Sequence, residues 1–260
     1  MTDFAPQDDL GSHEVTNQPR PDAAADPWQG DIALRERMGG AGAADRAALA
    51  AFGAGAGSAE MRAAARAAER HPPEACLFDR GGRRLDEVRF HPGYHALMGF
   101  GLGAGYAARP WEAAPGGHLV HAAMVYMLSQ IEPGVCCPMT MTYAAIPALR
   151  ADPGLEALWR PRLMARDHDG ASLPLGRKRA ATMGMAMTEK QGGSDVRANS
   201  TRAERDGAHW RLTGHKWFCS APMSDGFLTL AQAPGGLTCL VVPRWTPDER
   251  RNGIRLMRLK

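Results

Sequence analysis

The chain is poor in lysine and in aromatic residues, and its charges nearly balance. Only four of its 31 basic residues are lysine, and aromatic residues make up 7% of the 260 positions. The formal net charge of +3 excludes a strongly basic nucleic-acid-binding chain but leaves room for a local basic patch. We ascribe the excess of arginine, alanine and glycine to base composition, so isolated surface arginines carry little weight as functional signals.

The sequence also lacks a membrane span and a cysteine framework. The longest uncharged stretch with apolar character, residues 133–149, contains Pro138 and Pro147 and suits a spanning helix poorly. The first 30 residues carry acids and no apolar run, so no secretory signal is expected. Five cysteines, two of them adjacent, give neither a disulfide framework nor a CxxC metal spacing. We therefore expect a cytoplasmic protein with no membrane contact and no metal site.

Helical signals dominate the first two thirds of the chain. Alanine-rich residues 60–70 form the clearest helix, which His71 and two prolines end. Apolar spacing and prolines at helix starts predict further helices after Pro92 and over residues 118–131, 138–149 and 154–164.

Strand signals replace helical ones near Ala180. Residues 200–205 and 208–213 predict a β-hairpin, with Asp206-Gly207 supplying the two turn residues of positive φ and with Trp210 and Leu212 on one face. Residues 227–231, 237–242 and 254–260 predict three more strands.

The sequence therefore predicts an α+β protein in three parts. We expect a flexible N-terminal arm over residues 1–30 and a mostly helical domain over residues 31–178. An antiparallel, β-barrel-like middle domain would follow over residues 179–260. That last domain is expected to be truncated, because its final strand has no partner after it.

Two separated motifs carry the most specific chemistry. Met185–Asp195 is an apolar strand that turns into a loop with two adjacent glycines and two hydroxyl side chains. Gly214–Ser220 offers the rings of Trp217 and Phe218 followed by a small hydroxyl. Rings to stack, hydroxyls and free backbone amides are what the edge of an isoalloxazine requires. The alternative is a glycine turn beside a half-buried aromatic strand.

This pair of motifs resembles the acyl-CoA dehydrogenase superfamily, in which a Met-Thr-Glu…Gly-Ser-Asp loop and a Lys-x-(Trp/Phe)-x-(Ser/Thr) strand hold FAD. More segments, in the right order, are similar to its alkylation-response (AidB-type) branch. They are His13–Pro19, Gly81–Pro92, Cys137–Thr142, Met187–Val196 and Ile254–Lys260. The resemblance covers nearly the whole chain and implies FAD as cofactor, acyl-CoA as a possible substrate and a homotetramer.

The resemblance assigns roles to individual residues. Thr188 matches the threonine that bonds the pyrimidine side of the flavin, and Ser194 matches the serine at the edge shared with a thioester ligand. Phe218 occupies the ring position that flanks the flavin, and Ser220 matches the hydroxyl residue facing N5. The remaining cofactor-binding residues implied are Met185, Met187, Gly193 and Cys219.

Three residues depart from the general family. Lys190 stands where proline is usual, Gly192 where alanine is usual, and Cys219 replaces a common apolar residue. These departures favour the alkylation-response branch over ordinary fatty-acyl specificity.

Family members continue well beyond this length. The part without a counterpart here supplies the catalytic glutamate, tetramer contacts and, in the alkylation-response branch, the basic DNA-binding surface. We therefore assign no catalytic residue, do not take Glu189 as the base, and expect DNA contact only through that missing domain. The expected function is that of an FAD-binding acyl-CoA dehydrogenase-like protein of the DNA alkylation response. The alternatives are a DNA-protecting binding protein with a structural flavin and an inactive truncated fragment.

Other motifs are weaker. Gly99–Ala104 formally matches a dinucleotide fingerprint but also suits tight helix packing. The histidine pairs His91/His95 and His118/His121 have spacings at which a metal could bind, although surface or core histidines are the alternative.

Two further features could be functional but also have a purely structural explanation. The charged stretch of residues 162–169, together with Arg177-Lys178-Arg179, could meet phosphate or form a solvated loop. Cys136-Cys137, at a predicted helix start, could carry a lowered thiol pKa or simply pack.

Overall fold

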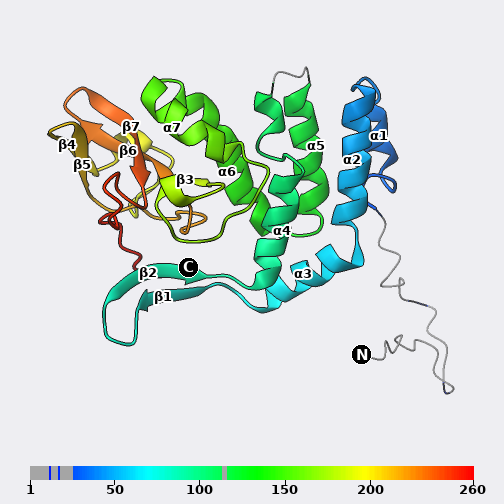
Figure 1. Cartoon of the computed structure of the whole chain (residues 1–260), viewed down its shortest axis with the longest axis horizontal. Coiled ribbons are helices and arrows are strands. Elements are labelled where there is room, and N and C mark those ends of the chain that lie inside the picture. The colour runs from blue at the N-terminus through cyan, green and yellow to red at the C-terminus, as the bar shows by residue number, and fades with distance from the viewer. Residues whose placement is uncertain (1–11, 13–16, 18–25, 113–115) are drawn as a thin grey trace.

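The computed structural model describes residues 12, 17, 26–112 and 116–260. The predicted N-terminal arm and the His13–Pro19 motif therefore lie almost entirely outside the described residues. In Figure 1, the first helices form one end of the molecule, a sheet forms the other, and α6 and α7 lie between them. The helices are α1 (Ile32–Arg37), α2 (Ala43–Ala56), α3 (Ala59–Arg70), α4 (Pro92–Gly103), α5 (Gly117–Ser129), α6 (Pro133–Leu149) and α7 (Pro153–Leu163).

The strands belong to two sheets. A hairpin of β1 (Glu74–Phe78) and β2 (Arg84–Arg89) runs along the lower side of Figure 1. The second sheet contains β3 (Met183–Ala186), β4 (Arg202–Asp206), β5 (His209–Thr213), β6 (Gly226–Ala233) and β7 (Gly236–Pro243). The predicted α+β class is confirmed.

Local signals explain where the helices begin and end. The Ser58 side chain accepts a hydrogen bond from Met61 N at 3.2 Å and so caps α3, which ends before Pro72 and Pro73. Helix α6 begins at Pro133, five residues before the predicted start. The Glu132 carboxylate caps it, and Pro138 and Pro147 lie inside it. No described helix is both long enough and apolar enough to span a membrane.

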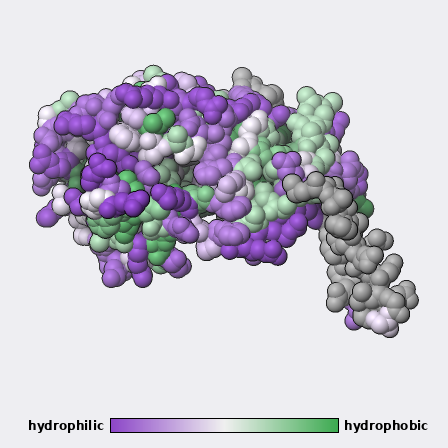
Figure 2. Space-filling model, turned by 60° about the horizontal axis from the view of Figure 1, so that its bottom comes forward, coloured by the Kyte–Doolittle hydropathy of each residue, from purple (hydrophilic) through white to green (hydrophobic). Residues whose placement is uncertain are grey.

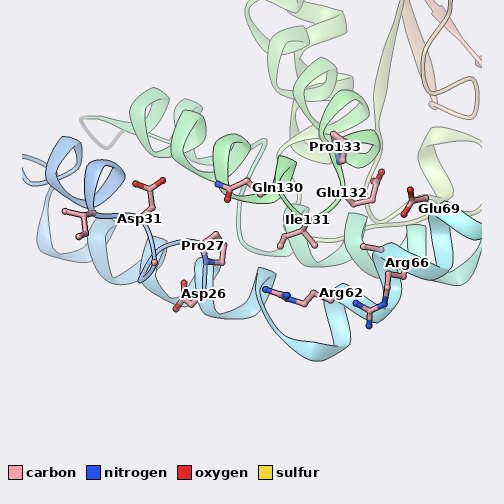
Figure 3. Close-up of a pocket in the computed structure, with 13 residues that line it drawn as sticks. Asp26, Pro27, Asp31, Arg62, Arg66, Glu69, Gln130, Ile131, Glu132 and Pro133 are labelled. Carbon is pink, nitrogen blue, oxygen red and sulfur yellow. The ribbon is translucent and has the colours of Figure 1, made fainter. Parts of the chain in front are cut away.

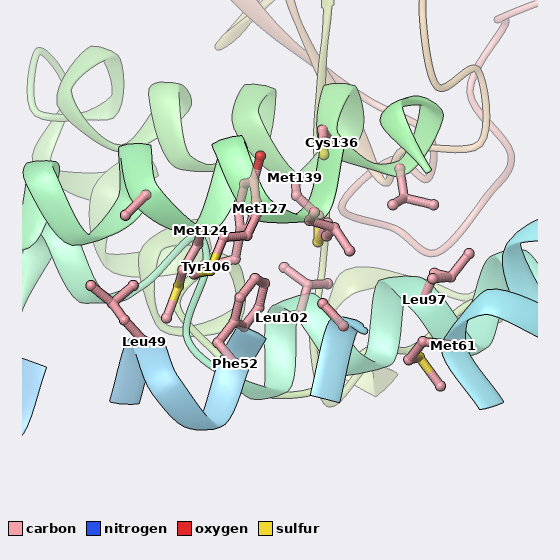
Figure 4. Packing of buried hydrophobic residues seen from close by; sticks show 14 of the residues in the cluster. Leu49, Phe52, Met61, Leu97, Leu102, Tyr106, Met124, Met127, Cys136 and Met139 are labelled. Atoms are coloured by element: carbon pink, nitrogen blue, oxygen red, sulfur yellow. The ribbon is translucent and has the colours of Figure 1, made fainter. Parts of the chain in front are cut away.

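The main hydrophobic core lies where α2, α4, α5 and α6 meet, and Figure 4 shows its packing. Leu49, Leu97, Met124 and Met139, one from each of these helices, are all buried completely. A Cβ on Gly101 would lie 2.6 Å from the Met139 sulfur, so the absence of a side chain there lets Met139 of α6 pack closely on α4. The Gly99–Ala104 motif lies at the end of α4, and its Gly101 serves helix packing. On the face in Figure 2 hydrophilic residues predominate, and hydrophobic residues form small patches.

The five-stranded sheet is mixed, which corrects the prediction of an antiparallel domain. Strand β3 pairs in parallel with β6, and β4 meets β6 in parallel at a single residue pair. The β4–β5 and β6–β7 pairs are antiparallel. Tight turns between strands that follow each other in the sequence suggest antiparallel pairing. Strand β3, however, leads into a long loop, so it pairs with a strand that is distant in sequence. The strands of the described residues form no closed barrel.

The predicted hairpin is present with a shifted turn. Asp206 pairs with His209, so the two turn residues are Gly207 and Ala208 rather than Asp206 and Gly207. Only Gly207 has a positive φ, 61°. A turn with glycine at its first central position needs only one such residue. Trp210 is half-buried like Leu212, as expected from alternation.

Residues 254–260 are not a strand, contrary to the prediction. The Leu256 N–H donates to the Asp86 carboxylate at 2.8 Å, and Arg84 donates to the Leu256 carbonyl at 3.2 Å. Side chains of β2 therefore take the groups that a neighbouring strand would pair. The β1–β2 hairpin itself was not predicted, although the sequence marks its Asp79–Gly82 turn.

Candidate functional site

The two motifs singled out in the sequence lie against each other. The Trp217 N–H donates to the Thr188 carbonyl at 2.9 Å, joining the loop after β3 to the segment after β5. The Lys216 ammonium lies 3.0 Å from a Glu189 carboxylate oxygen and 3.4 Å from the Met187 carbonyl. Three consecutive residues of the first motif, Met187 to Glu189, are thus held against Lys216 and Trp217 of the second.

Glu189 is the centre of this junction. Its side chain is inaccessible to solvent, and its oxygens accept hydrogen bonds from Lys216, from Gln191 Nε2 at 2.6 Å, and from the N–H groups of Ser200 at 2.7 Å and Thr201 at 2.8 Å. Burial alone would raise the pKa of Glu189, but the hydrogen bonds from Thr201, Ser200 and Gln191 outweigh it and hold the pKa well below its ordinary value. A carboxylate so occupied anchors the loop and is unsuited to accept a substrate proton.

The predicted methionines belong to the support of the site. Met185, in β3, and Met187, just after it, are half-buried and pack on a second core cluster that includes Trp159 and Leu228. The Met187 carbonyl also accepts a hydrogen bond from Asn199 Nδ2 at 2.8 Å. These residues fix the start of the loop.

Thr188 and Gly193 face each other across the loop. A Cβ on Gly193 would lie 2.8 Å from Thr188 Oγ1 and 2.9 Å from its Cγ2. The close approach is possible only without a side chain at position 193. Thr188 is half-buried, whereas Gly193 and Ser194 are exposed.

The other predicted residues lie in the second segment. Phe218 is 60% exposed and has a φ of 56°, a left-handed conformation that is unusual for an aromatic residue. Ser220 is exposed, and Cys219 is half-buried. Burial raises the pKa of the Cys219 thiol, so this cysteine is neutral at pH 7.

These groups have the chemistry that a flavin requires. Several polar groups of the two motifs have no hydrogen-bond partner among the described residues. They are the hydroxyls of Thr188, Ser194 and Ser220 and the N–H groups of Gly193 and Ser194. Hydroxyls and amides without a partner offer hydrogen bonds, and the exposed Phe218 ring offers a stacking surface. The residues present therefore fit an isoalloxazine edge.

Sequence reasoning missed the residues that hold the site together. Asn199 and Thr201 were not singled out, Lys216 was included only as part of its motif, and Glu189 was considered only to be set aside as the base. The available signal was that each motif contains a residue of opposite charge: Glu189 in the first and Lys216, one of only four lysines, in the second.

The histidine pairs with metal-like spacing do not act as pairs. His91 stacks on His71, whereas His95 Nδ1 lies 2.9 Å from His168 Nε2. His121 bonds the Tyr106 carbonyl at 2.7 Å. Within residues 26–112 and 116–260, no group of three or more histidine, cysteine or acidic residues could hold a metal ion.

The remaining sequence candidates have structural roles. Cys136 lies one turn inside α6, and burial raises its pKa to about 11, which favours the packing interpretation. In the basic stretch, Arg166, Lys178 and Arg179 are all paired with carboxylates. Lys178 is buried, 2.7 Å from Asp225, and also donates to the carbonyls of Asp169 and Ala171, so its ammonium is occupied within the fold and does not meet phosphate.

A surface groove of about 850 Å³ lies among the N-terminal helices (Figure 3). Two of its acids cap helices: Asp31 accepts from Leu34 N at 2.8 Å, and Glu132 accepts from Gly134 N at 2.9 Å. None of the residues predicted to bind the cofactor lines it. The groove therefore does not belong to the candidate site.

Comparison with known protein families shows which family this chain belongs to. The family model described as the adaptive response protein AidB N-terminal domain matches residues 17–170, and the acyl-CoA dehydrogenase middle domain matches residues 184–260. The chain belongs to the AidB branch of the acyl-CoA dehydrogenase superfamily. It is 46% identical over 255 residues to the putative acyl-CoA dehydrogenase AidB of Escherichia coli (strain K12), covering 96% of this chain and 47% of that protein.

A second curated relative carries the name of an acyl-CoA dehydrogenase, and two solved structures share the fold. Acyl-CoA dehydrogenase family member 11 of Caenorhabditis elegans is 30% identical over 225 residues, covering 78% of this chain and 35% of that protein. The C. elegans ACDH-11 structure in complex with C11-CoA has a TM-score of 0.79 at 27% identity, over 98% of this chain and 45% of that one. The Bd2924 apo-form has a TM-score of 0.78 at 29% identity, over 91% and 49%. The chain thus spans about half the length of these relatives, or less.

Proposed function

We propose that this chain forms the flavin-holding part of an FAD-dependent acyl-CoA dehydrogenase of the DNA alkylation response. The observation that carries the proposal is the junction of Thr188 with Trp217 and of Glu189 with Lys216. It brings the loop and the ring-bearing segment to one place. The matching family models support the assignment to this enzyme class, and the AidB name supports the alkylation response.

In this proposal the chain's own residues bind and orient the cofactor. The hydroxyls of Thr188, Ser194 and Ser220 would bond polar atoms of the isoalloxazine edge, and the exposed ring of Phe218 would flank it. When bound, FAD supplies the acceptor for the hydride removed in acyl thioester oxidation. Met185, Met187, Gly193 and Cys219 shape the surroundings, and no residue of this chain is assigned as the base. We further propose residues 31–178 and 179–260 as the two structural units.

Titration of the chain with FAD, followed by flavin fluorescence and absorbance, tests the proposal. We expect saturable binding, weakened about three- to tenfold in Ser194→Ala and in Ser220→Ala, because each loses one hydrogen bond. Ser129→Ala is the matched control, since Ser129 is exposed at the end of α5. Absence of FAD binding, or equal effects in all three variants, would contradict the proposal.

A further inference from the structure

A group of cations and aromatic rings adjoins the proposed flavin site. We call Lys190, Trp217, Phe218, Arg258 and Lys260 the basic–aromatic cluster. Lys190 Nζ lies 5.7 Å and Arg258 Cζ 5.3 Å from the centre of the Trp217 ring, and Lys260 Nζ lies 4.8 Å from the centre of the Phe218 ring. The two rings contact each other edge to face, with centres 5.7 Å apart.

We propose that Lys190 and Arg258 bind the phosphate groups of a nucleotide ligand at Trp217. The inference rests on the proposed function and deepens it. A phosphate-bearing nucleotide is common to FAD and to a coenzyme A thioester, and the experiment below separates the two.

The cluster converges from three separate segments. Lys190 belongs to the loop after β3, Trp217 to the segment after β5, and Arg258 to the final residues of the chain. The Leu256 N–H donates to Asp86 at 2.8 Å, which fixes the backbone two residues before Arg258. Because both cations already lie against the Trp217 ring, their side chains have less conformational entropy to lose on binding.

Within the described part of the chain, the cations of this cluster have no acidic partner. Among the described residues, none of Lys190, Arg258 and Lys260 forms an ion pair, and all three side chains are exposed. By contrast, the exposed arginines Arg211 and Arg250 each have an acidic partner within the same part of the chain. The acid beside Lys190, Glu189, is buried and paired with Lys216.

The loop offers further groups for an anion. Lys190 lies three residues before Gly193, and the N–H groups of Gly193 and Ser194 have no partner among the described residues. Successive free amides beside cations attract phosphate oxygens. The exposed Phe218 ring supplies a surface for a planar group. Phosphates joined to an aromatic base satisfy both features at once.

Calorimetric titration of the full chain tests the inference with two pairs of ligands, in each of which one member carries a phosphate-bearing nucleotide part and the other lacks it. The probes are FAD against riboflavin, and coenzyme A against pantetheine. The variant is Lys190→Met with Arg258→Met, which keeps the apolar stems and removes both charges. The matched control is Arg205→Met, because Arg205 lies 4.5 Å from the Trp210 ring centre in a comparable exposed pair.

We expect the double variant to weaken binding of a phosphate-bearing ligand about tenfold and to leave its phosphate-free partner within about twofold. Raising the salt concentration should weaken binding of the wild type to that ligand and spare the double variant. Loss for FAD alone assigns the phosphates to the flavin nucleotide, and loss for coenzyme A alone assigns them to the thioester.

Unchanged binding of both FAD and coenzyme A in the double variant overturns the inference. So does an equal loss for riboflavin, or the same loss in Arg205→Met. A wild type that binds neither riboflavin nor FAD contradicts the proposed function instead, and the coenzyme A arm then still decides whether Lys190 and Arg258 bind phosphate.

Discussion

Glu189 and Lys216 form an ion pair of 3.0 Å in which the carboxylate side chain is completely buried and the lysine side chain is 9% exposed. A buried ion pair requires further hydrogen bonds to compensate for desolvation, and Ser200, Thr201 and Gln191 supply them. The pair connects the two segments that carry the predicted flavin ligands. Its integrity is therefore a condition for the site.

Replacing Glu189 by Gln should destabilise the protein by about 3 kcal/mol, because it leaves the Lys216 ammonium buried without a counter-charge. Urea unfolding measures the effect. Glu204→Gln, on the exposed side of β4, is the control and should change the unfolding free energy by less than about 0.5 kcal/mol. Equal stability of the two variants would show that the ion pair does not hold the loop.

Gly193→Ala should weaken FAD binding while changing the stability of the fold only slightly. The new Cβ meets the Thr188 side chain, which can rotate away, so the unfolding free energy should fall by only about 1 kcal/mol. Rotation misplaces the Thr188 hydroxyl, and FAD binding should weaken. Gly235→Ala is the matched control, because a Cβ there meets nothing within 4 Å. Unchanged FAD affinity in Gly193→Ala would remove Thr188 from the site.

The His95–His168 contact predicts a loss of stability in mild acid. Burial, reinforced by His95 and Lys178, lowers the pKa of His168 to about 4. Below about pH 6.5 the unfolded chain takes up a proton that the folded site refuses, so His168 costs no stability above that pH. Between about pH 6.5 and pH 4 the unfolding free energy should fall by about 3 kcal/mol from this group.

His168→Gln should flatten that dependence while keeping an amide donor for His95. The measurement is the unfolding free energy at a series of pH values. His209→Gln, at an exposed position in β5, is the control and should keep the slope of the wild type. A slope in His168→Gln as steep as that of the wild type would assign it to other groups.

Arg244 joins the β1–β2 hairpin to the mixed sheet. Its guanidinium is buried and donates to the carbonyls of Asp86 at 3.3 Å, Ser224 at 3.2 Å and Pro222. Arg244→Met leaves these three carbonyls without their donor, so we expect a loss of about 3 kcal/mol in thermal or urea unfolding. Arg202→Met, exposed on β4, is the control. A small loss would mean that water replaces the guanidinium.

Local signals predicted the local structure well. The alanine-rich run predicted as residues 60–70 is α3 at Ala59–Arg70, and the strands predicted as 227–231 and 237–242 lie within β6 and β7. The parallel β3–β6 pair was not predicted, because periodicity shows that a strand exists but not which distant strand it joins. Residues 254–260 alternate like a strand, yet Asp86 and Arg84 take their backbone groups.

For the site, the sequence identified the residues with exposed chemistry but not those that hold them. Phe218 and Ser220 stand out because rings and hydroxyls indicate a ligand. Glu189 and Lys216 do not, because a charged residue is expected at the surface unless a partner is known. Only the three-dimensional contact shows that each is the other's partner.

The parallel pairing of β3 with β6 has a consequence for the order of folding. Residues 187–225 form the connection between these two strands, and they include every predicted flavin ligand except Met185. A parallel pair closes a long loop before it gains its hydrogen bonds, and such non-local contacts form slowly. The helical end of the molecule, rich in local contacts, is therefore expected to assemble first. Competence to take up a cofactor should appear only in the last kinetic phase of refolding.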